Sequence, residues 1–191
     1  MALQGDFREH LLAFQDLEIE GNLVKTASEI SKVDALVIPG GESTTISKLA
    51  KSFGLLDLIS ERIASGMPAF GTCAGMILLS NSIVDPASSQ DVFGGIDMQV
   101  RRNAFGRQTE SFEADLDFQA IGEEPFRGVF IRAPWVEKFA PEVEILASIE
   151  SGGIQRSVAV RQGSILATAF HPELTGDRRI HNYFLNEVCG K

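Results

Sequence analysis

The sequence lacks most features that would set it apart from ordinary globular proteins. Only two of its 191 residues are cysteine, Cys73 and Cys189, too few for the disulfide framework of a small secreted protein. No apolar run approaches the roughly 20 residues of a membrane-spanning helix. The first ten residues contain no apolar stretch like that of a signal peptide. We therefore expect a reducing cytoplasmic location, no membrane contact, and a thiol that can stay reactive.

Positive charge is also scarce. The chain has 17 Lys and Arg against 26 Asp and Glu, for a net charge of −9. Such a chain has little with which to form the basic stripe that binds nucleic acids or anionic membranes, so we expect neither partner. Its three histidines and two cysteines show no metal-ligand spacing, and we expect no metal or other cofactor.

No repeat, low-complexity tract or linker divides the chain, so one domain over residues 1–191 is expected. Apolar spacing and turn residues give the element boundaries, with Ser43 or Thr44 as the N-cap of the second helix and Gly152-Gly153 as a hairpin turn. Strands are predicted over 23–24, 35–38, 68–70, 111–116, 128–131, 143–149, 158–161 and 165–170, and helices over 6–17, 43–53, 55–64, from 76 onward, and 177–189. This pattern predicts an α/β fold of three layers, with a mostly parallel mixed sheet flanked by helices.

The sharpest local signal is Gly71-Thr72-Cys73-Ala74-Gly75, the cysteine form of a nucleophile elbow. A strand turns abruptly into a helix there, and the nucleophile stands at the edge of the sheet. Glycines on both sides suit a turn that a β-carbon would crowd. The start of the helix favours the thiolate form of Cys73. A buried structural cysteine beside two loop glycines is the alternative, about as probable on this motif alone.

His171-Pro172-Glu173 directly follows the apolar strand predicted over 165–170. Residues i and i+2 of an extended segment point the same way, so His171 and Glu173 can face one site. A cysteine hydrolase needs a base for the thiol proton and a third group that orients the base. Since sites in open α/β sheets lie at the carboxyl ends of strands, catalysis is favoured over a structural histidine.

Pro39-Gly40-Gly41-Glu42-Ser43-Thr44 also follows a buried strand and opens a helix. Backbone N–H groups of such a turn can bind an oxyanion, although a plain glycine-rich turn is more probable from this segment alone. Among the remaining candidates, His10 is interpreted as structural or on the surface and His181 as exposed. Cys189 is interpreted as inert packing.

Taken together, these segments resemble the class I, triad-type glutamine amidotransferases, with a flavodoxin-like core. Within that class they are similar to the glutaminase subunits of pyridoxal 5′-phosphate synthase. The matching segments lie in order along nearly the whole chain: 2–6, 39–45, 71–75, 102–108, 111–115, 128–134 and 170–175.

The resemblance implies that Cys73 attacks the side-chain amide of L-glutamine to form a γ-glutamyl thioester. His171 would move the protons and Glu173 would orient it. Backbone N–H groups of Gly41 and Ala74 would form the oxyanion hole. The implied glutamine-binding residues are Gly41, Glu42, Ser43, Arg102, Ile131 and Arg132.

The resemblance also implies a partner, the synthase subunit that receives the ammonia and makes pyridoxal 5′-phosphate (vitamin B6). The glutaminase itself would need no cofactor. Family members usually have a few apolar residues before Ala2-Leu3-Gln4-Gly5 that complete the first strand. Because Met1 precedes Ala2 here, we expect that strand to be a stub.

Three other functions remain open from the residues. The chain could be a triad glutaminase that feeds a different synthase, although the segments specific to the subfamily argue against this. It could be a cysteine peptidase or thiol hydrolase, which would turn over peptides or esters. It could be a regulatory module without activity, but such a module has no chemical reason to retain Cys73, His171 and Glu173 together.

Overall fold

The computed structural model describes residues 1–84, 90–105 and 111–190. Its strands are β1 (Leu36–Ile38), β2 (Ala69–Thr72), β3 (Ser80–Ile83), β4 (Ile96–Arg101), β5 (Ser111–Leu116), β6 (Phe126–Ile131), β7 (Trp135–Phe139), β8 (Glu144–Ser151), β9 (Ile154–Gln162) and β10 (Ile165–Thr168). Its helices are α1 (Phe7–Asp16), α2 (Ala27–Ile30), α3 (Ser43–Ser52), α4 (Leu56–Ala64), α5 (Ala74–Leu79) and α6 (Arg179–Tyr183), with the short turns η1 (Gln119–Ile121) and η2 (Pro172–Leu174) and the π-helical η3 (Phe184–Val188).

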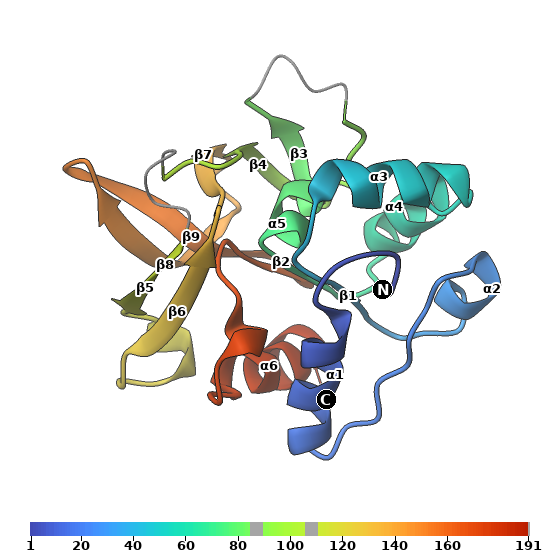
Figure 1. Cartoon of the computed structure of the whole chain (residues 1–191), viewed down its shortest axis with the longest axis horizontal. Coiled ribbons are helices and arrows are strands. Elements are labelled where there is room, and N and C mark those ends of the chain that lie inside the picture. Colours follow the sequence, from blue (N-terminus) through green and yellow to red (C-terminus); the bar gives the residue numbers. More distant parts are fainter. Residues whose placement is uncertain (85–89, 106–110, 191) are drawn as a thin grey trace.

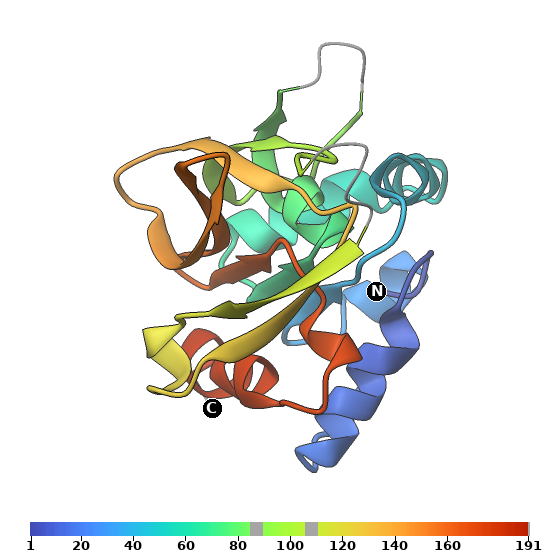
Figure 2. The ribbon, with the colours of Figure 1, turned by 60° about the vertical axis from the view of Figure 1, so that its left-hand side comes forward.

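An eight-stranded mixed sheet forms the centre, with strand order β1-β2-β10-β9-β7-β4-β3 and β8 paired to β9. Helices α3, α4 and α5 lie on one side of the parallel strands, and α1 and α6 lie on the other (Figure 1). A two-stranded sheet of β5 and β6 lies between the C-terminal helices and the main sheet (Figure 2). The predicted α/β class, mixed sheet and flanking helices are therefore confirmed.

The parallel part of the sheet consists of β1, β2 and β10, together with the pair of β3 and β4. All four residues of β2 and all four of β10 are buried, as expected for strands covered on both faces. Because β1, β2 and β10 run in the same direction, their carboxyl ends meet at one edge. The segments that carry Gly40, Cys73 and His171 all begin at this edge.

The other strands pair mainly antiparallel. The predicted hairpin at Gly152-Gly153 is confirmed, since it joins β8 to β9 and both glycines have positive φ angles of 61° and 75°. The sequence prediction missed β3, β4, β7 and the short helix α2.

Three local predictions were wrong. Residues 23–24 form no strand. The predicted C-terminal helix begins two residues later, at Arg179, and its second half is π-helical. The N-cap of α3 is Glu42, whose carboxylate accepts the N–H of Thr45 at 2.8 Å, because a longer acidic side chain there reaches the same free N–H group.

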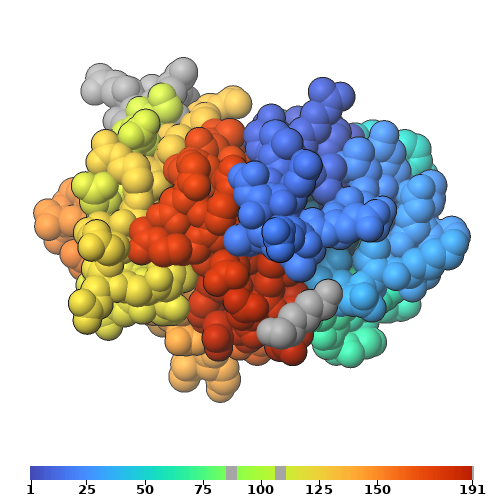
Figure 3. All heavy atoms as spheres, turned by 90° about the horizontal axis from the view of Figure 1, so that it is seen from below, coloured from blue at the N-terminus to red at the C-terminus, as the bar shows by residue number. Residues whose placement is uncertain are grey.

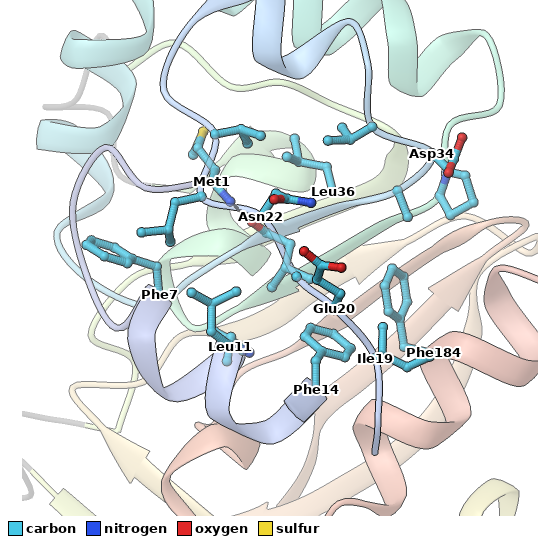
Figure 4. A pocket seen from close by; sticks show the side chains of 18 of the residues that line it. Met1, Phe7, Leu11, Phe14, Ile19, Glu20, Asn22, Asp34, Leu36 and Phe184 are labelled. Atoms are coloured by element: carbon cyan, nitrogen blue, oxygen red, sulfur yellow. Dashed lines mark hydrogen bonds between the residues drawn. The ribbon is translucent and has the colours of Figure 1, made fainter. Parts of the chain in front are cut away.

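Met1 occupies the place expected for the first strand, and residues 1–6 form no strand, as the stub prediction requires. Its amino group donates to the Val37 carbonyl at 2.6 Å, and the next N–H donates to the Val24 carbonyl at 2.9 Å. A pocket of about 290 Å³ continues from there between residues 19–24 and residues 32–37 (Figure 4). The outer edge of β1 faces this pocket without a strand partner among the described residues.

The two ends of the chain pack together. Helix α1 lies beside the C-terminal helical segment on the face shown in Figure 3. Arg178 Nη2 and Asp16 Oδ2, 2.8 Å apart, form an ion pair between the two segments. No helix among the described residues is long and apolar enough to cross a membrane.

Candidate active site

Cys73 lies at the turn between β2 and α5 in a strained backbone conformation, with φ 48° and ψ −99°. Its N–H donates to the Thr168 carbonyl at 2.8 Å, which ties the turn to β10. A β-carbon on Gly71 would collide with the Gly75 backbone, and one on Gly75 would collide with the Ile38 carbonyl. Both glycines of the elbow are therefore required by close backbone approach, as predicted. The cysteine is a free thiol and is mostly buried.

His171 and Glu173 form a buried pair at the end of β10. The Nδ1 atom of His171 is 2.8 Å from Glu173 Oε1, and the backbone N–H of His171 donates to the Val129 carbonyl at 2.8 Å. Because a carboxylate can only accept, we assign the ring proton to Nδ1, which leaves Nε2 as the atom available to a thiol. The predicted closeness of His171 and Glu173 is therefore present.

The electrostatics of this pair favour a charged imidazole. Burial by itself lowers the pKa of His171, but interactions with the Cys73 sulfur and the Glu173 carboxylate outweigh it and raise the pKa to about 10. Burial raises the pKa of Glu173, whereas the hydrogen bond from His171 lowers it. The His171 imidazole is thus charged at neutral pH.

Cys73 and His171 do not form a hydrogen bond of ordinary geometry. Within the described part of the chain, His171 Nε2 is buried without a partner, and Cys73 Sγ lies 3.8 Å from the Ile131 carbonyl. Catalytic hydrogen bonds are often loose in enzymes without substrate. The Asp6 carboxylate is a second neighbour of the ring, 3.8 Å from Nδ1. The ligand atoms of Asp6, His171 and Glu173 lie within 4.8 Å of one another, a grouping that spacing along the sequence did not indicate.

The glycine-rich turn after β1 packs directly on the base. A β-carbon on Gly40 would overlap the His171 ring, and one on Gly41, whose φ is 149°, would meet the Gln4 side chain. Gln4 Oε1 also accepts the backbone N–H of Glu42 at 2.8 Å. The turn is therefore held beside the site by its backbone. On the facing segment, the Ala74 N–H belongs to the first turn of α5 and has no intrahelical acceptor.

Three of the predicted glutamine-binding residues share one hydrogen-bond cluster. Arg102 Nη2 donates to Glu42 Oε1 at 3.2 Å. Gln90 Oε1 accepts from Ser43 Oγ at 3.1 Å and from Arg102 Nη1 at 3.3 Å. Partial burial opposes ionisation of Glu42, but hydrogen bonds from Thr44 and Thr45 outweigh it and lower its pKa. The cluster therefore offers one carboxylate and one guanidinium close together.

Ile131 and Arg132, at the end of β6, complete the predicted set. The Ile131 carbonyl faces the Cys73 sulfur, so this residue lies directly at the nucleophile. Arg132 has a positive φ of 43°, an uncommon conformation for a residue other than glycine. Of the matching segment 102–108, residues 106–108 lie outside the described residues.

The prediction for His181 needs correction, because this residue is completely buried and not exposed. His10, predicted to be structural or on the surface, is buried. Their rings face each other, with His10 Nδ1 3.0 Å from His181 Nε2. Both were placed by helical position alone, and short helices give little indication of which face is covered. Thr72, Gln4 and Gln90 were also missed, because polar residues in turns carry no distinctive signal.

Comparison with known proteins agrees with the fold. A solved glutamine amidotransferase superposes with a TM-score of 0.90 at 47% identity, covering 100% of this chain and 97% of that one. A putative GMP synthase subunit from Thermoplasma acidophilum shares the fold alone, with a TM-score of 0.66 at 18% identity, covering 100% of this chain and 92% of that one. These likenesses define the chain as having a glutamine amidotransferase fold.

The particular family follows from the sequence. The chain belongs to the SNO glutamine amidotransferase family, whose model matches residues 1–190. The pyridoxal 5′-phosphate synthase subunit PdxT of Streptomyces avermitilis is 57% identical, covering 98% of this chain and 92% of that relative. The PdxT subunit of Acidothermus cellulolyticus is 56% identical, covering 100% of this chain and 93% of that relative.

Proposed function

We propose that this chain is the glutaminase subunit of a pyridoxal 5′-phosphate synthase. It hydrolyses L-glutamine to L-glutamate and ammonia and delivers the ammonia to the synthase subunit. Identity of more than 50% over nearly the full length of named PdxT subunits supports this function. The observation that carries the chemistry is the meeting of Cys73 with the His171–Glu173 pair at the ends of the adjacent strands β2 and β10.

In the proposed mechanism, the Cys73 thiolate attacks the amide carbon of the glutamine side chain. The imidazolium of His171 gives its Nε2 proton to the leaving nitrogen of the tetrahedral intermediate. The C–N bond breaks, ammonia departs, and a γ-glutamyl thioester remains on Cys73. His171 then takes a proton from water, which attacks the thioester, and glutamate is released. Glu173 holds the ring in the correct tautomer and stabilises its positive charge throughout. Backbone N–H groups of Gly41 and Ala74 bind the oxyanion of both tetrahedral intermediates.

The Glu42–Arg102 pair suits the other end of glutamine. A free amino acid carries an α-carboxylate and an α-ammonium on one carbon, and the pair presents the two opposite charges together. Ser43, the Gly41 turn, Ile131 and Arg132 form the remaining walls in this proposal. Selection of free glutamine over glutamine within a peptide follows, since peptide bonds on both sides would remove both charges.

The remaining proposals concern the domain, the cofactor requirement, the cellular location and the transfer of ammonia. Residues 1–191 are proposed to act as one glutaminase domain that needs no cofactor for hydrolysis. Cys73 forms no disulfide, which fits a reducing cytoplasm. Ammonia that passes directly into a synthase subunit is protected from protonation in solution, and this is the physical reason for a two-subunit enzyme.

The test is glutamate release from glutamine by this chain with and without a synthase subunit. We expect release that increases when the synthase is added and disappears in Cys73→Ala. Cys189→Ala, which removes the other thiol, is the matched control and should keep full activity. Turnover of peptides or esters with indifference to glutamine would instead identify a thiol hydrolase. Retained activity in Cys73→Ala would exclude the proposed nucleophile.

A further inference from the structure

Behind the triad lies a second buried polar cluster that the proposed mechanism does not use. His10 Nε2 is 3.1 Å from Thr72 Oγ1 and 3.6 Å from Glu173 Oε2. Thr72 Oγ1 is in turn 3.5 Å from Glu173 Oε1. The other nitrogen of His10 faces His181, and every side chain of this cluster is buried. Residues from α1, β2, η2 and α6 thus converge on the side of Glu173 away from Cys73.

The donors and acceptors of this cluster fix the direction in which its hydrogen bonds run. The Gly40 N–H donates to Thr72 Oγ1 at 3.0 Å, so the hydroxyl can accept there and donate its own proton to Glu173. If His10 carries its proton on Nε2, it donates to the Thr72 oxygen and lies next to Glu173 Oε2. Its Nδ1 then accepts the N–H of His181. Every donor in this series of hydrogen bonds then points toward the Glu173 carboxylate.

The opposite assignment is less favourable. A proton on His10 Nδ1 would be donated to His181 Nε2 and would require the proton of His181 on Nδ1. That atom is buried and has no partner within the described part of the chain, and an unsatisfied N–H group costs more than an unused lone pair. This tautomer of His10 would also place no N–H near Glu173 Oε2. That oxygen has no other hydrogen-bond partner among the described residues. Burial of Glu173 makes such a donor necessary.

We propose that His10 is a positioning residue for the hydrolysis: as a neutral imidazole it directs donors, through Thr72, onto Glu173 and so holds that carboxylate ionised and aligned with His171. The proposal rests on the proposed function. His10 contacts neither substrate nor sulfur and acts only through Glu173. Cooperative polarisation along a one-way chain of hydrogen bonds strengthens the last bond, the one that Thr72 donates to Glu173.

The surroundings of His10 keep it uncharged. Burial lowers its pKa well below the ordinary value, and His181, the Met1 amino group and His171 lower it further. The groups that face it are His181 from α6, Thr72 from β2 and Glu173 from η2. Among these groups, only the Glu173 carboxylate favours protonation of His10. That carboxylate already pairs with His171.

The test compares His10→Phe with His10→Gln in glutamate release by the chain assembled with a synthase subunit. Phenylalanine fills the space without a donor, so kcat should fall roughly 10-fold or more, the effect of losing a donor to a buried charge. The amide of glutamine can place an N–H near the Nε2 position and should restore most of the rate. KM for glutamine should change little, since the substrate side is untouched. Loss of the donor raises the pKa of Glu173, so the acid limb of kcat should move to higher pH.

Phe14→Leu is the matched control, because Phe14 lies on the same buried face of α1 and contacts the His181 ring. It should lose stability but keep kcat and the pH profile. An unchanged kcat and acid limb in folded His10→Phe would overturn the proposal. So would an equal loss of kcat in Phe14→Leu. If Cys73→Ala were still active, the proposed function itself would fail, and that result is separate from either outcome at His10.

Discussion

The imidazole of His171 lies against the backbone of Gly40 with no room for a side chain between them. A β-carbon on Gly40 would overlap Cε1 of the ring and approach Nδ1 within 2.8 Å. The residue at position 40 therefore sets the position of the base, although it carries no chemical group of its own.

Gly40→Ala is expected to push the ring away from Cys73 and Glu173. Displacement of a catalytic group by about 1 Å costs on the order of 100-fold, so kcat should fall by roughly that factor. Glutamate release with the synthase present measures it. Gly176→Ala is the control, since a β-carbon there has open space and should leave kcat unchanged. Full activity of Gly40→Ala would mean that the ring is not held by this contact.

Arg102→Met is expected to weaken glutamine binding with a smaller effect on kcat. Loss of a charge-assisted hydrogen bond to the α-carboxylate costs about 1.5–3 kcal/mol, so KM should rise roughly 10- to 150-fold. The neighbouring Arg101 is a suitable control, because its side chain pairs with Glu137 and takes no part in the cluster of Glu42 and Gln90. Arg101→Met should keep the KM of the parent. Equal KM values for both variants would remove Arg102 from the glutamine site.

Stability is expected to rise with pH between about pH 4 and pH 6.5. Burial, aided by Arg178, lowers the pKa of His181 to about 4. In this window the unfolded chain binds a proton at His181 that the folded chain does not, so acid favours unfolding. The slope from one such group reaches about 1.4 kcal/mol per pH unit. His171 does not contribute to the slope here, because its raised pKa gives stability that is full below pH 6.5 and lost only as pH rises through 10.

His181→Phe should flatten this pH dependence, and denaturant unfolding at several pH values measures it. A slope from His10 should remain, because burial lowers its pKa as well. Asn182→Ala on the same helix carries no titrating group and should keep the parent slope. An unchanged slope in His181→Phe would show that His181 titrates normally in the folded protein.

An apolar segment joined ahead of Met1 is expected to stabilise the fold. The pocket runs back from Met1 along residues 19–24 and 32–37, so an added strand of about five residues would lie parallel to β1. A rise in Tm of about 3 °C or more would correspond to roughly 1 kcal/mol. A Gly/Ser segment of equal length is the control and should give no rise. If both extensions behave alike, the outer edge of β1 does not accept a strand.

The parts of the site that could be predicted from the sequence are those in which backbone geometry restricts residue choice. Cys73 between two glycines and His171-Pro172-Glu173 after an apolar strand are of this kind. The edge at which they meet follows from the parallel direction of the strands. The strands β1 and β2 and the helices α1, α3 and α4 were predicted because fully buried strands and amphipathic helices have clear periodicity.

The parts that could not be predicted depend on contacts between distant residues. The strand β3 has two exposed residues among its four, Ser80–Ile83, and its sequence resembles a loop. The strand β4 does alternate, with Ile96, Met98 and Val100 buried, but it lies between turn residues and was overlooked. The pairing of His10 with His181 joins helices from opposite ends of the chain, and no local pattern encodes it.

The pairing register of β2 and β10 determines which parts of the chain can change in length without moving Cys73 relative to β10. Thr72 pairs with Thr168, and the N–H of Cys73 donates to that same Thr168 carbonyl, so this ladder fixes the position of Cys73 relative to β10. The Val129 carbonyl in turn holds the backbone N–H of His171. Insertions at the Gly152-Gly153 turn, where both glycines have open space around them, can therefore remodel the far end of the β8–β9 hairpin without changing the distance between Cys73 and His171.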